Sequence, residues 1–335
     1  YEMIMPKAEQ TKPRMTDVRA ALKQGISQLR DAGVPSFTLA AEILLLHTLG
    51  RDRTWLYAHP EELISESDTQ RFHKLLSRRA NGEPTQHLTG KQEFWGLEFE
   101  VTPDVLIPRP ETEHLIEVAL DRLAVREIRA GRKQTLTGEG LEIADVGTGS
   151  GCIAIALANE LPGARIVATD ISPAALAIAR RNAARHKLSD RIQFLESNLL
   201  DGATVGARYI GPLQRDPAAN TEDESPVPTH QPLFFDLIVS NPPYIGRRES
   251  ESLMREVRDH EPEIALYGGE EGYEFYAGLI AQAAAHLKPG GLLVLELGHN
   301  SLSAVQPLLD LPNWTNAGVT KDLAGIDRVI SAERT

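Results

Sequence analysis

The stretch of sequence that decides the fold is Leu141-Glu142-Ile143-Ala144-Asp145-Val146-Gly147-Thr148-Gly149-Ser150-Gly151. Its first six residues are mostly apolar and predict a buried strand, Leu141–Val146, which ends where three glycines begin. Glycines there let the backbone turn sharply into a helix and approach a ligand at the carboxyl edge of a sheet. Taken alone, the loop also fits a nicotinamide-dinucleotide site or a tight turn that binds nothing.

The spacing of this loop narrows the choice of ligand. It reads Gly-x-Gly-x-Gly with Asp145 just before it, whereas a dinucleotide-binding loop reads Gly-x-Gly-x-x-Gly. A carboxylate in this place repels a pyrophosphate and attracts a cation. The loop therefore favours S-adenosylmethionine, which carries a sulfonium and an amino group.

Strands and helices alternate around this loop, which predicts an α/β domain with a mostly parallel sheet and helices on both faces. The predicted strands are Leu141–Val146, Arg165–Thr169, Ile192–Glu196, Asp236–Ser240, Gly291–Leu297 and Asp327–Ser331. The predicted helices are Cys152–Asn159, Pro173–His186, Gly272–His286 and Ser301–Leu309. The proline-rich residues 202–232 contain an acidic run and predict a surface loop inserted before a strand.

The residues before this domain differ in pattern. Residues 1–15 are polar and predict a flexible extension, while residues 16–90 carry apolar residues at helical spacing and predict a small helical domain. Residues 91–108 contain a short alternating pattern and predict a β-hairpin linker, so that residues 109–335 form the α/β domain. Periodicity leaves open whether the helical domain is a scaffold or a docking module.

Composition limits the classes of function. The 335 residues include 47 acidic and 35 basic ones, for a net charge of -12, which argues against nucleic acid as the substrate. The basic pairs Arg78-Arg79, Arg180-Arg181 and Arg247-Arg248 are isolated. One cysteine excludes an intramolecular disulfide, and no metal site is predicted. The absence of a long apolar run or an apolar leader predicts a cytoplasmic protein with no membrane partner.

A second candidate site residue is Asp170, which ends the strand after the glycine loop. It stands 25 positions after Asp145, where a carboxylate can accept both hydroxyls of a ribose. The alternative is a helix cap, in which Asp170 or Ser172 caps the helix that Pro173 starts. Both roles can hold together, because the cap would also fix the loop.

The most specific motif is Asn241-Pro242-Pro243-Tyr244, which follows an apolar strand. The two prolines stiffen the loop and remove two N–H donors. The side-chain oxygen of Asn241 and the carbonyl of Pro242 can then accept both N–H bonds of a planar –NH2 group, with Tyr244 stacked on its plane. Such a clamp positions a nitrogen for attack on an electrophilic methyl group. A bare strand terminator is the other interpretation.

These motifs together resemble the release-factor glutamine methyltransferases of the HemK/PrmC type, from about Thr16 onward. The glycine loop and the Asn241–Tyr244 loop resemble the family's cofactor and catalytic loops. The other resembling segments are Arg109-Pro110-Glu111-Thr112-Glu113, Glu261-Pro262 with Ala265-Leu266, Gly268-Gly269 with Gly272, and Asp322-Leu323-Ala324-Gly325-Ile326-Asp327-Arg328.

The resemblance implies a Rossmann-like class I methyltransferase domain, with a mostly parallel seven-stranded sheet, behind a small all-helical domain. It implies N5-methylation of the glutamine in the Gly-Gly-Gln loop of peptide chain release factors, with the helical domain contacting the release factor. The implied catalytic residues are Asn241, Pro242 and Tyr244, and Pro243 joins them in substrate binding. The implied S-adenosylmethionine-binding residues are Gly147, Thr148, Gly149, Ser150, Gly151, Asp170, Asn198, Leu199 and Asn241.

Two other functions remain open from the sequence. The exocyclic amine of adenine is also a planar –NH2, so the Asn241–Tyr244 loop would serve a DNA adenine-N6 methyltransferase equally well. Such an enzyme must flip a base and hold a duplex, which calls for a basic region. A binding module that has lost catalysis is the third possibility, and the intact loops argue against it.

Overall fold

The computed structural model describes residues 16–131, 136–201, 203 and 233–335. The predicted extension, residues 1–15, and nearly all of the predicted inserted loop, residues 202–232, lie outside the described residues. The chain divides into two compact units. The first runs to Gly90 and includes Arg255–His260, and the second contains the remaining residues from Lys91 onward. In the part of the chain that the structure describes, no helix is long and apolar enough to cross a membrane.

The first unit is built from helices with regular start signals. Asp17 and Ser65 occupy N-cap positions, and their side chains accept hydrogen bonds from backbone N–H groups in the first turn. Buried leucines and Phe72 form its core. A short strand, β2 (Leu63–Ile64), pairs antiparallel with β1 (Thr16–Asp17). The helices are α1 (Val18–Asp31), α2 (Phe37–Leu49), α3 (Arg53–Ala58), α4 (Glu66–Ala80) and α5 (Thr85–Thr89).

Residues Arg255–His260 belong to the first unit although they follow the Asn241–Tyr244 loop in the sequence. They contain α9 (Arg255–Arg258). Glu256 forms an ion pair with Arg79 of α4, whose side chain is 6% exposed. A buried charge is destabilising unless an opposite charge lies beside it, so this ion pair attaches residues Arg255–His260 to the helices of the first unit. The domain boundaries predicted from the sequence contain no such excursion.

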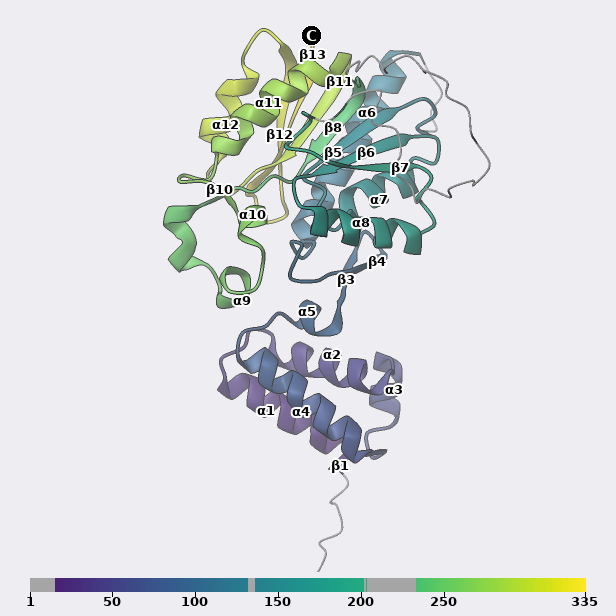
Figure 1. Cartoon of the computed structure of the whole chain (residues 1–335), viewed down its shortest axis with the longest axis vertical. Coiled ribbons are helices and arrows are strands. Elements are labelled where there is room, and N and C mark those ends of the chain that lie inside the picture. Colours follow the sequence, from purple (N-terminus) through teal and green to yellow (C-terminus); the bar gives the residue numbers. More distant parts are fainter. Residues whose placement is uncertain (1–15, 132–135, 202, 204–232) are drawn as a thin grey trace, which may run out of the picture. The chain divides into compact units, whose positions relative to one another are not determined.

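The second unit holds a seven-stranded sheet in the order β12-β13-β11-β8-β5-β6-β7 (Figure 1). The five strands from β11 to β7 are parallel, and β13 is antiparallel to both of its neighbours. This is the mostly parallel seven-stranded sheet that the sequence predicts. The strands are β5 (Glu142–Val146), β6 (Arg165–Asp170), β7 (Ile192–Glu196), β8 (Phe235–Ser240), β11 (Leu287–Glu296), β12 (Trp314–Lys321) and β13 (Asp327–Arg334).

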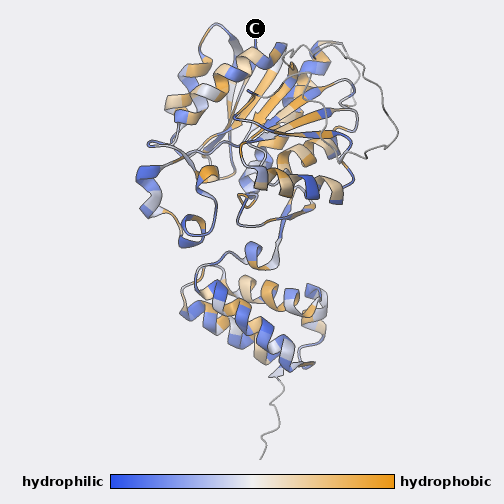
Figure 2. Cartoon of the chain, in the orientation of Figure 1, coloured by the Kyte–Doolittle hydropathy of each residue, from blue (hydrophilic) through white to orange (hydrophobic). Residues whose placement is uncertain are grey.

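Helices cover both faces of the sheet, as predicted. Successive strand residues point to opposite faces, so Ile143 and Leu237 pack into one core and Ala144 and Ile238 into the other. Figure 2 shows the apolar residues concentrated on the strands and the polar ones on the outer helix surfaces. The first core receives α6 (Glu113–Arg129) and α7 (Cys152–Glu160), beside α8 (Pro173–Arg185), and the second receives α11 (Glu274–His286) and α12 (Leu302–Leu309).

Several short elements of the second unit lie outside the seven-stranded sheet. The predicted hairpin is β3 (Lys91–Phe94) and β4 (Leu97–Glu100), turned by Trp95 and Gly96 with positive φ. The remaining short elements are η1 (Pro110–Thr112), β9 (Ile245–Gly246), η2 (Arg247–Ser252), α10 (Glu263–Leu266) and β10 (Tyr267–Gly269).

The topology creates a crevice beside β5. The chain passes from β5 to β6 and β7 on one side and reaches β8, on the other side of β5, only afterwards. Loops diverge where the strand order reverses, and ligands bind outside the carboxyl ends of the strands at this point. The glycine loop follows β5 and the Asn241–Tyr244 loop follows β8. The two motifs therefore meet at the switch point.

Candidate functional site

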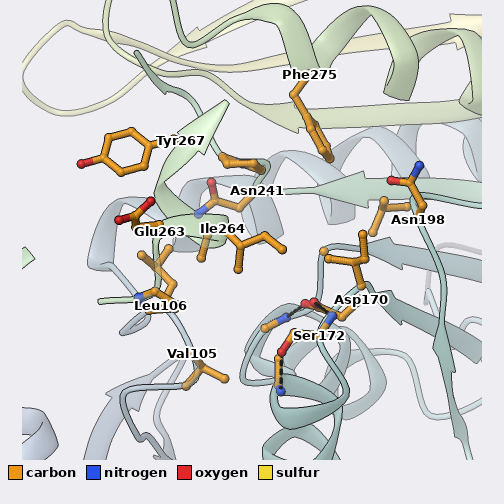
Figure 3. Close-up of a pocket in the computed structure, with 18 of the residues that line it drawn as sticks. Val105, Leu106, Asp170, Ser172, Asn198, Asn241, Glu263, Ile264, Tyr267 and Phe275 are labelled. Carbon is orange, nitrogen blue, oxygen red and sulfur yellow. Dashed lines mark hydrogen bonds between the residues drawn. The ribbon is translucent and has the colours of Figure 1, made fainter. Parts of the chain in front are cut away.

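A cavity of about 460 Å³ opens at the carboxyl ends of β5, β6, β7 and β8 (Figure 3). This volume is in the range of small-molecule sites. Its walls come from four predicted site segments and from residues that the sequence did not single out. The lining residues are Asp104, Val105, Leu106, Val146, Gly147, Gly149, Asp170, Ile171, Ser172, Ala175, Ser197, Asn198, Leu199, Asn241, Pro243, Arg247, Pro262, Glu263, Ile264, Ala265, Tyr267 and Phe275.

The glycine loop lies against the cavity with only part of its residues. Gly147 and Gly149 line it, and the Gly149 N–H donates to Asp170 Oδ2 at 2.8 Å. Thr148, Ser150 and Gly151 lie behind this wall. Thr148 Oγ1 donates to Asp145 at 2.6 Å, and Gly151 starts α7 in the left-handed conformation. The loop thus combines two residues that can touch a ligand with three that hold the turn.

Asp145 differs from the expectation that its charge faces a cationic ligand. It is fully buried and does not line the cavity. Its Oδ2 accepts from the Thr148 hydroxyl and from the Ala154 N–H at 3.1 Å. Burial raises the pKa of Asp145 to about 7, against the lowering effect of these two hydrogen bonds. Its direct contribution is to fix the loop and the start of α7.

Asp170 lines the cavity at the end of β6 (Figure 3). Its two carboxylate oxygens accept from the Gly149 N–H and, at 2.9 Å, from the Ser172 N–H. Burial raises its pKa, while these backbone hydrogen bonds oppose the rise. Ser172 caps α8 by accepting from the Ala175 N–H at 3.2 Å, so the cap and the cavity residue are neighbours. Further lone pairs on Asp170 are available to ligand hydroxyls.

Asn198 and Leu199 line the cavity beyond β7, as the resemblance implies. Leu199 has a φ of 54°, a left-handed conformation that branched side chains seldom adopt. Phe275, at the start of α11, adds an aromatic ring, and Figure 3 shows it pointing into the space between Asn241 and Asn198. The sequence analysis missed Phe275, because its only local signal is its place just after the Gly268–Gly272 segment.

The Asn241–Tyr244 loop begins where β8 ends. Ser240 Oγ donates to the Val146 carbonyl at 2.6 Å and ties this end to the end of β5. Asn241 and Pro243 line the cavity, whereas Pro242 is buried and Tyr244 is partly buried behind it. Tyr244 packs against the core and its hydroxyl donates to Glu296 at 3.4 Å.

The two atoms of the Asn241 amide have different environments. Nδ2 donates to Thr112 Oγ1 at 3.0 Å. Oδ1 is buried and has no donor within the described residues. A buried acceptor without a partner costs about 1–3 kcal/mol, so it calls for an explanation, and a ligand donor is one.

Glycines in the segment after the loop let two chains approach closely. A Cβ on Gly268 would lie 2.2 Å from the Pro243 carbonyl oxygen, and one on Gly272 would lie 2.4 Å from the Tyr244 carbonyl oxygen. Real Cβ atoms cannot sit there, so only glycine permits the parallel pairing of β9 with β10. This packing holds the Asn241–Tyr244 loop against the residues that close the cavity.

Arg109 has an internal partner. It forms an ion pair with Glu261, whose side chain is 1% exposed. The other oxygen of Glu261 accepts from the Ile107 N–H at 3.2 Å. Glu261 thereby holds the Ile107–Arg109 backbone beside Pro262, which lines the cavity. Arg109 therefore neutralises a buried carboxylate that fixes this wall of the cavity.

The donor set fits a nucleoside ligand such as S-adenosylmethionine. Asp170 offers acceptors for sugar hydroxyls, Leu199 and Phe275 offer flat apolar surface for a base, and Gly147 and Gly149 let the backbone approach. Asn241 stands at the same cavity, and its Oδ1 has no donor among the residues that the structure describes. The cavity thus combines a place for a nucleoside with an acceptor for an N–H group.

Comparisons with known proteins identify relatives that are methyltransferases. The PrmC N-terminal domain model matches residues 20–90, and the Methyltransferase small domain model matches residues 133–209. A release factor glutamine methyltransferase of Koribacter versatilis is 41% identical over 93% of this chain and 97% of its own length. Those of Bradyrhizobium diazoefficiens and Geobacter sulfurreducens are 38% and 37% identical over 96% and 95% of this chain and 98% and 97% of their own lengths.

Solved structures are similar at lower identity. A methyltransferase from Pyrococcus furiosus is 17% identical, with a TM-score of 0.45, over 79% of this chain and 98% of its own. The relatives in sequence are far more similar and match nearly the full length on both sides. The chain belongs to the release factor glutamine methyltransferase family, whose members depend on S-adenosylmethionine.

Proposed function

We propose that this chain transfers a methyl group from S-adenosylmethionine to the side-chain amide nitrogen, N5, of the glutamine in the Gly-Gly-Gln motif of peptide chain release factors. The observation that carries the proposal is the buried Oδ1 of Asn241, a cavity-lining residue, which finds no partner in the described part of the chain. The relatives, which bear the name of this activity, support the choice of substrate.

In the proposed reaction Asn241 Oδ1 and the Pro242 carbonyl oxygen accept the two N–H bonds of the glutamine amide. Bound S-adenosylmethionine supplies an electrophilic methyl group. Two acceptors hold the nitrogen in line with that methyl and face the positive charge that develops on it. The methylated nitrogen then loses a proton to solvent, so no strong base is required.

Tyr244 would act from the side of the loop. Burial raises the pKa of its phenol and the neighbouring Glu296 raises it further, so Tyr244 stays neutral. A neutral ring can stack on the amide plane, and Pro243 would contribute to the same substrate pocket. The proposed cofactor residues are Gly147, Thr148, Gly149, Ser150, Gly151, Asp170, Asn198, Leu199 and Asn241.

The basic pairs support a protein substrate over DNA, because each of their arginines has an internal partner. Five of the six arginines bind a carboxylate, which partly neutralises the charge that they could offer a phosphate, and Arg180 lies over the ring of Phe194 and donates to its carbonyl oxygen. The partners are Glu83 for Arg78, Glu256 for Arg79, Phe194 for Arg180, Glu100 for Arg181, Glu263 for Arg247 and Glu271 for Arg248.

We further propose that the first unit contacts the release factor and that the enzyme acts in the cytoplasm, where translation takes place. The match of this unit to a domain of the family supports the docking role. Leu39 and Ile43, one turn apart on α2, are 48% and 37% exposed. Exposed apolar residues on one helix face suit a protein partner.

Methyl transfer from labelled S-adenosylmethionine tests the proposal. The acceptors are a purified release factor, the same factor with the Gly-Gly-Gln glutamine replaced by alanine, and duplex DNA. We expect label in the first only, on a peptide that mass spectrometry identifies as the Gly-Gly-Gln peptide. Label in DNA with none in the release factor would overturn the proposal in favour of an adenine methyltransferase.

A further inference from the structure

Thr112 is a buried residue of the second unit that contacts Asn241, which is far from it in the sequence. It precedes α6 and is 2% exposed. Its Oγ1 accepts from Asn241 Nδ2 at 3.0 Å. Glu296, at the end of β11, is fully buried. Burial raises the pKa of Glu296 to about 7, and a hydrogen bond with Thr112 opposes that rise.

The hydrogen bond between Thr112 and Asn241 has one direction. The –NH2 end of the Asn241 amide faces Thr112 and can only donate, so Thr112 Oγ1 accepts from it through a lone pair. The carbonyl end, Oδ1, is thereby left for the substrate.

The buried Glu296 carboxyl contacts the Tyr244 end of the Asn241–Tyr244 loop. Tyr244 OH donates to Glu296 Oε1 at 3.4 Å. The Tyr244 Cβ would be 2.8 Å from a Cβ on Gly298, which places the loop directly on the segment after β11. Tyr276 OH donates to the Glu296 carbonyl oxygen at 2.8 Å, and accepts from the Gly298 N–H at 3.2 Å. These hydrogen bonds fix Glu296 beside the Tyr244 end of the loop.

We propose that Thr112 is a positioning residue, which acts through Asn241 by holding its Nδ2 and so presenting its Oδ1, and never its Nδ2, to the methyl acceptor. The inference rests on the proposed function, since it needs an acceptor that donates N–H bonds. We call the hydrogen bond from Asn241 Nδ2 to Thr112 Oγ1 the relay. Without it, the Asn241 amide could turn by 180° and place its –NH2 group against the N–H donors of the substrate.

Thr112→Val tests the relay, because valine keeps the shape of threonine and removes the hydroxyl. Thr112→Ser restores the hydroxyl without the methyl group. Thr320→Val, on the exposed edge strand β12, is the matched control. Three quantities are measured: kcat with a release factor, the Kd for S-adenosylmethionine by calorimetry, and the 15N–1H signals of the Asn241 side-chain amide without substrate. Those signals are assigned by their absence in Asn241→Ala.

We expect Thr112→Val to lower kcat about 100-fold, as misplacement of a reacting group does, with the Kd for the cofactor changed less than about two-fold. Thr112→Ser should return kcat to within about three-fold of the parent enzyme. The Asn241 amide signals should shift or broaden in Thr112→Val and stay in place in Thr112→Ser and Thr320→Val.

Two results would overturn the relay. One is a kcat for Thr112→Val close to that of the parent, and the other is a serine variant as impaired as the valine variant, which would mean that the methyl group matters. A parent enzyme that fails to methylate the release factor would instead refute the proposed function. The amide signals test the relay in that case as well, because they require no substrate.

Discussion

Glu296→Gln is expected to make the second unit more stable above pH 7 while it impairs the enzyme. Glu296 is 0% exposed, and burial raises the pKa of its carboxyl to about 7 from an ordinary value of 4.5. Thr112, Arg328 and Tyr244 oppose this rise, and Glu111 adds to it. Burial therefore favours the neutral form of Glu296, and the carboxylate predominates only above about pH 7.

The sign and size of the effect follow from proton binding. The native state binds the Glu296 proton near pH 7 and the unfolded chain near pH 4.5. Between these values the native state holds more protons, so the free energy of unfolding falls as the pH rises, by about 1.4 kcal/mol per pH unit. The full loss is about 3 kcal/mol above pH 7. Glutamine avoids it but gives up one acceptor, which costs about 1 kcal/mol and leaves a gain of about 2 kcal/mol at pH 8.

Urea unfolding at several pH values between 5 and 8.5 measures this difference. A Trp55→Phe background restricts tryptophan fluorescence to the second unit, which holds Trp95 and Trp314. Burial also raises the pKa of Asp145 to about 7. Its effect on stability is the same in the parent and in Glu296→Gln, so it cancels when the free energies of unfolding of the two proteins are subtracted. Exposed Glu251→Gln is the control and should leave the curve unchanged. A Glu296→Gln difference that is independent of pH, or a variant less stable than the parent at pH 8, would refute the reasoning.

Two further substitutions test the site and its packing. Asn241→Ala should lower kcat by about 100- to 1,000-fold, because it removes an acceptor that faces the developing charge, while exposed Asn313→Ala should not; a loss of only a few-fold in methyl transfer would contradict the clamp. Gly268→Ala would place a Cβ 2.2 Å from the Pro243 carbonyl oxygen and should lower stability by about 1–3 kcal/mol. Gly318→Ala, which meets nothing within 4 Å, is its control, and equal melting temperatures for the two variants would show that the close approach is unimportant.

Some of the fold could not be read from the sequence. Strand β12 was not among the predicted strands, because residues 314–321 lie at the edge of the sheet and are mostly exposed. An edge strand that buries few side chains lacks the alternation that marks a half-buried one. The short helices α3 and α5 were missed for a related reason, since they offer too few turns to show a period.

The sequence by itself determined the main strands and helices of the α/β domain, the parallel sheet and the two loops that carry the chemistry. These are local properties, because apolar periodicity, glycine and proline act on the chain within a few residues. The glycine loop was expected at the carboxyl edge of the sheet for the same reason, because it follows a strand and precedes a helix.

Only the tertiary structure decided what each of these residues faces. It placed Asp145 inside the loop and Phe275 in the cavity wall, and it joined Thr112 to Asn241 and Tyr244 to Glu296 by hydrogen bonds. Such contacts depend on which residues from distant parts of the chain become neighbours when the core packs. No local pattern contains that information, because the hydrogen bonds and burial that give these side chains their roles exist only in the folded chain.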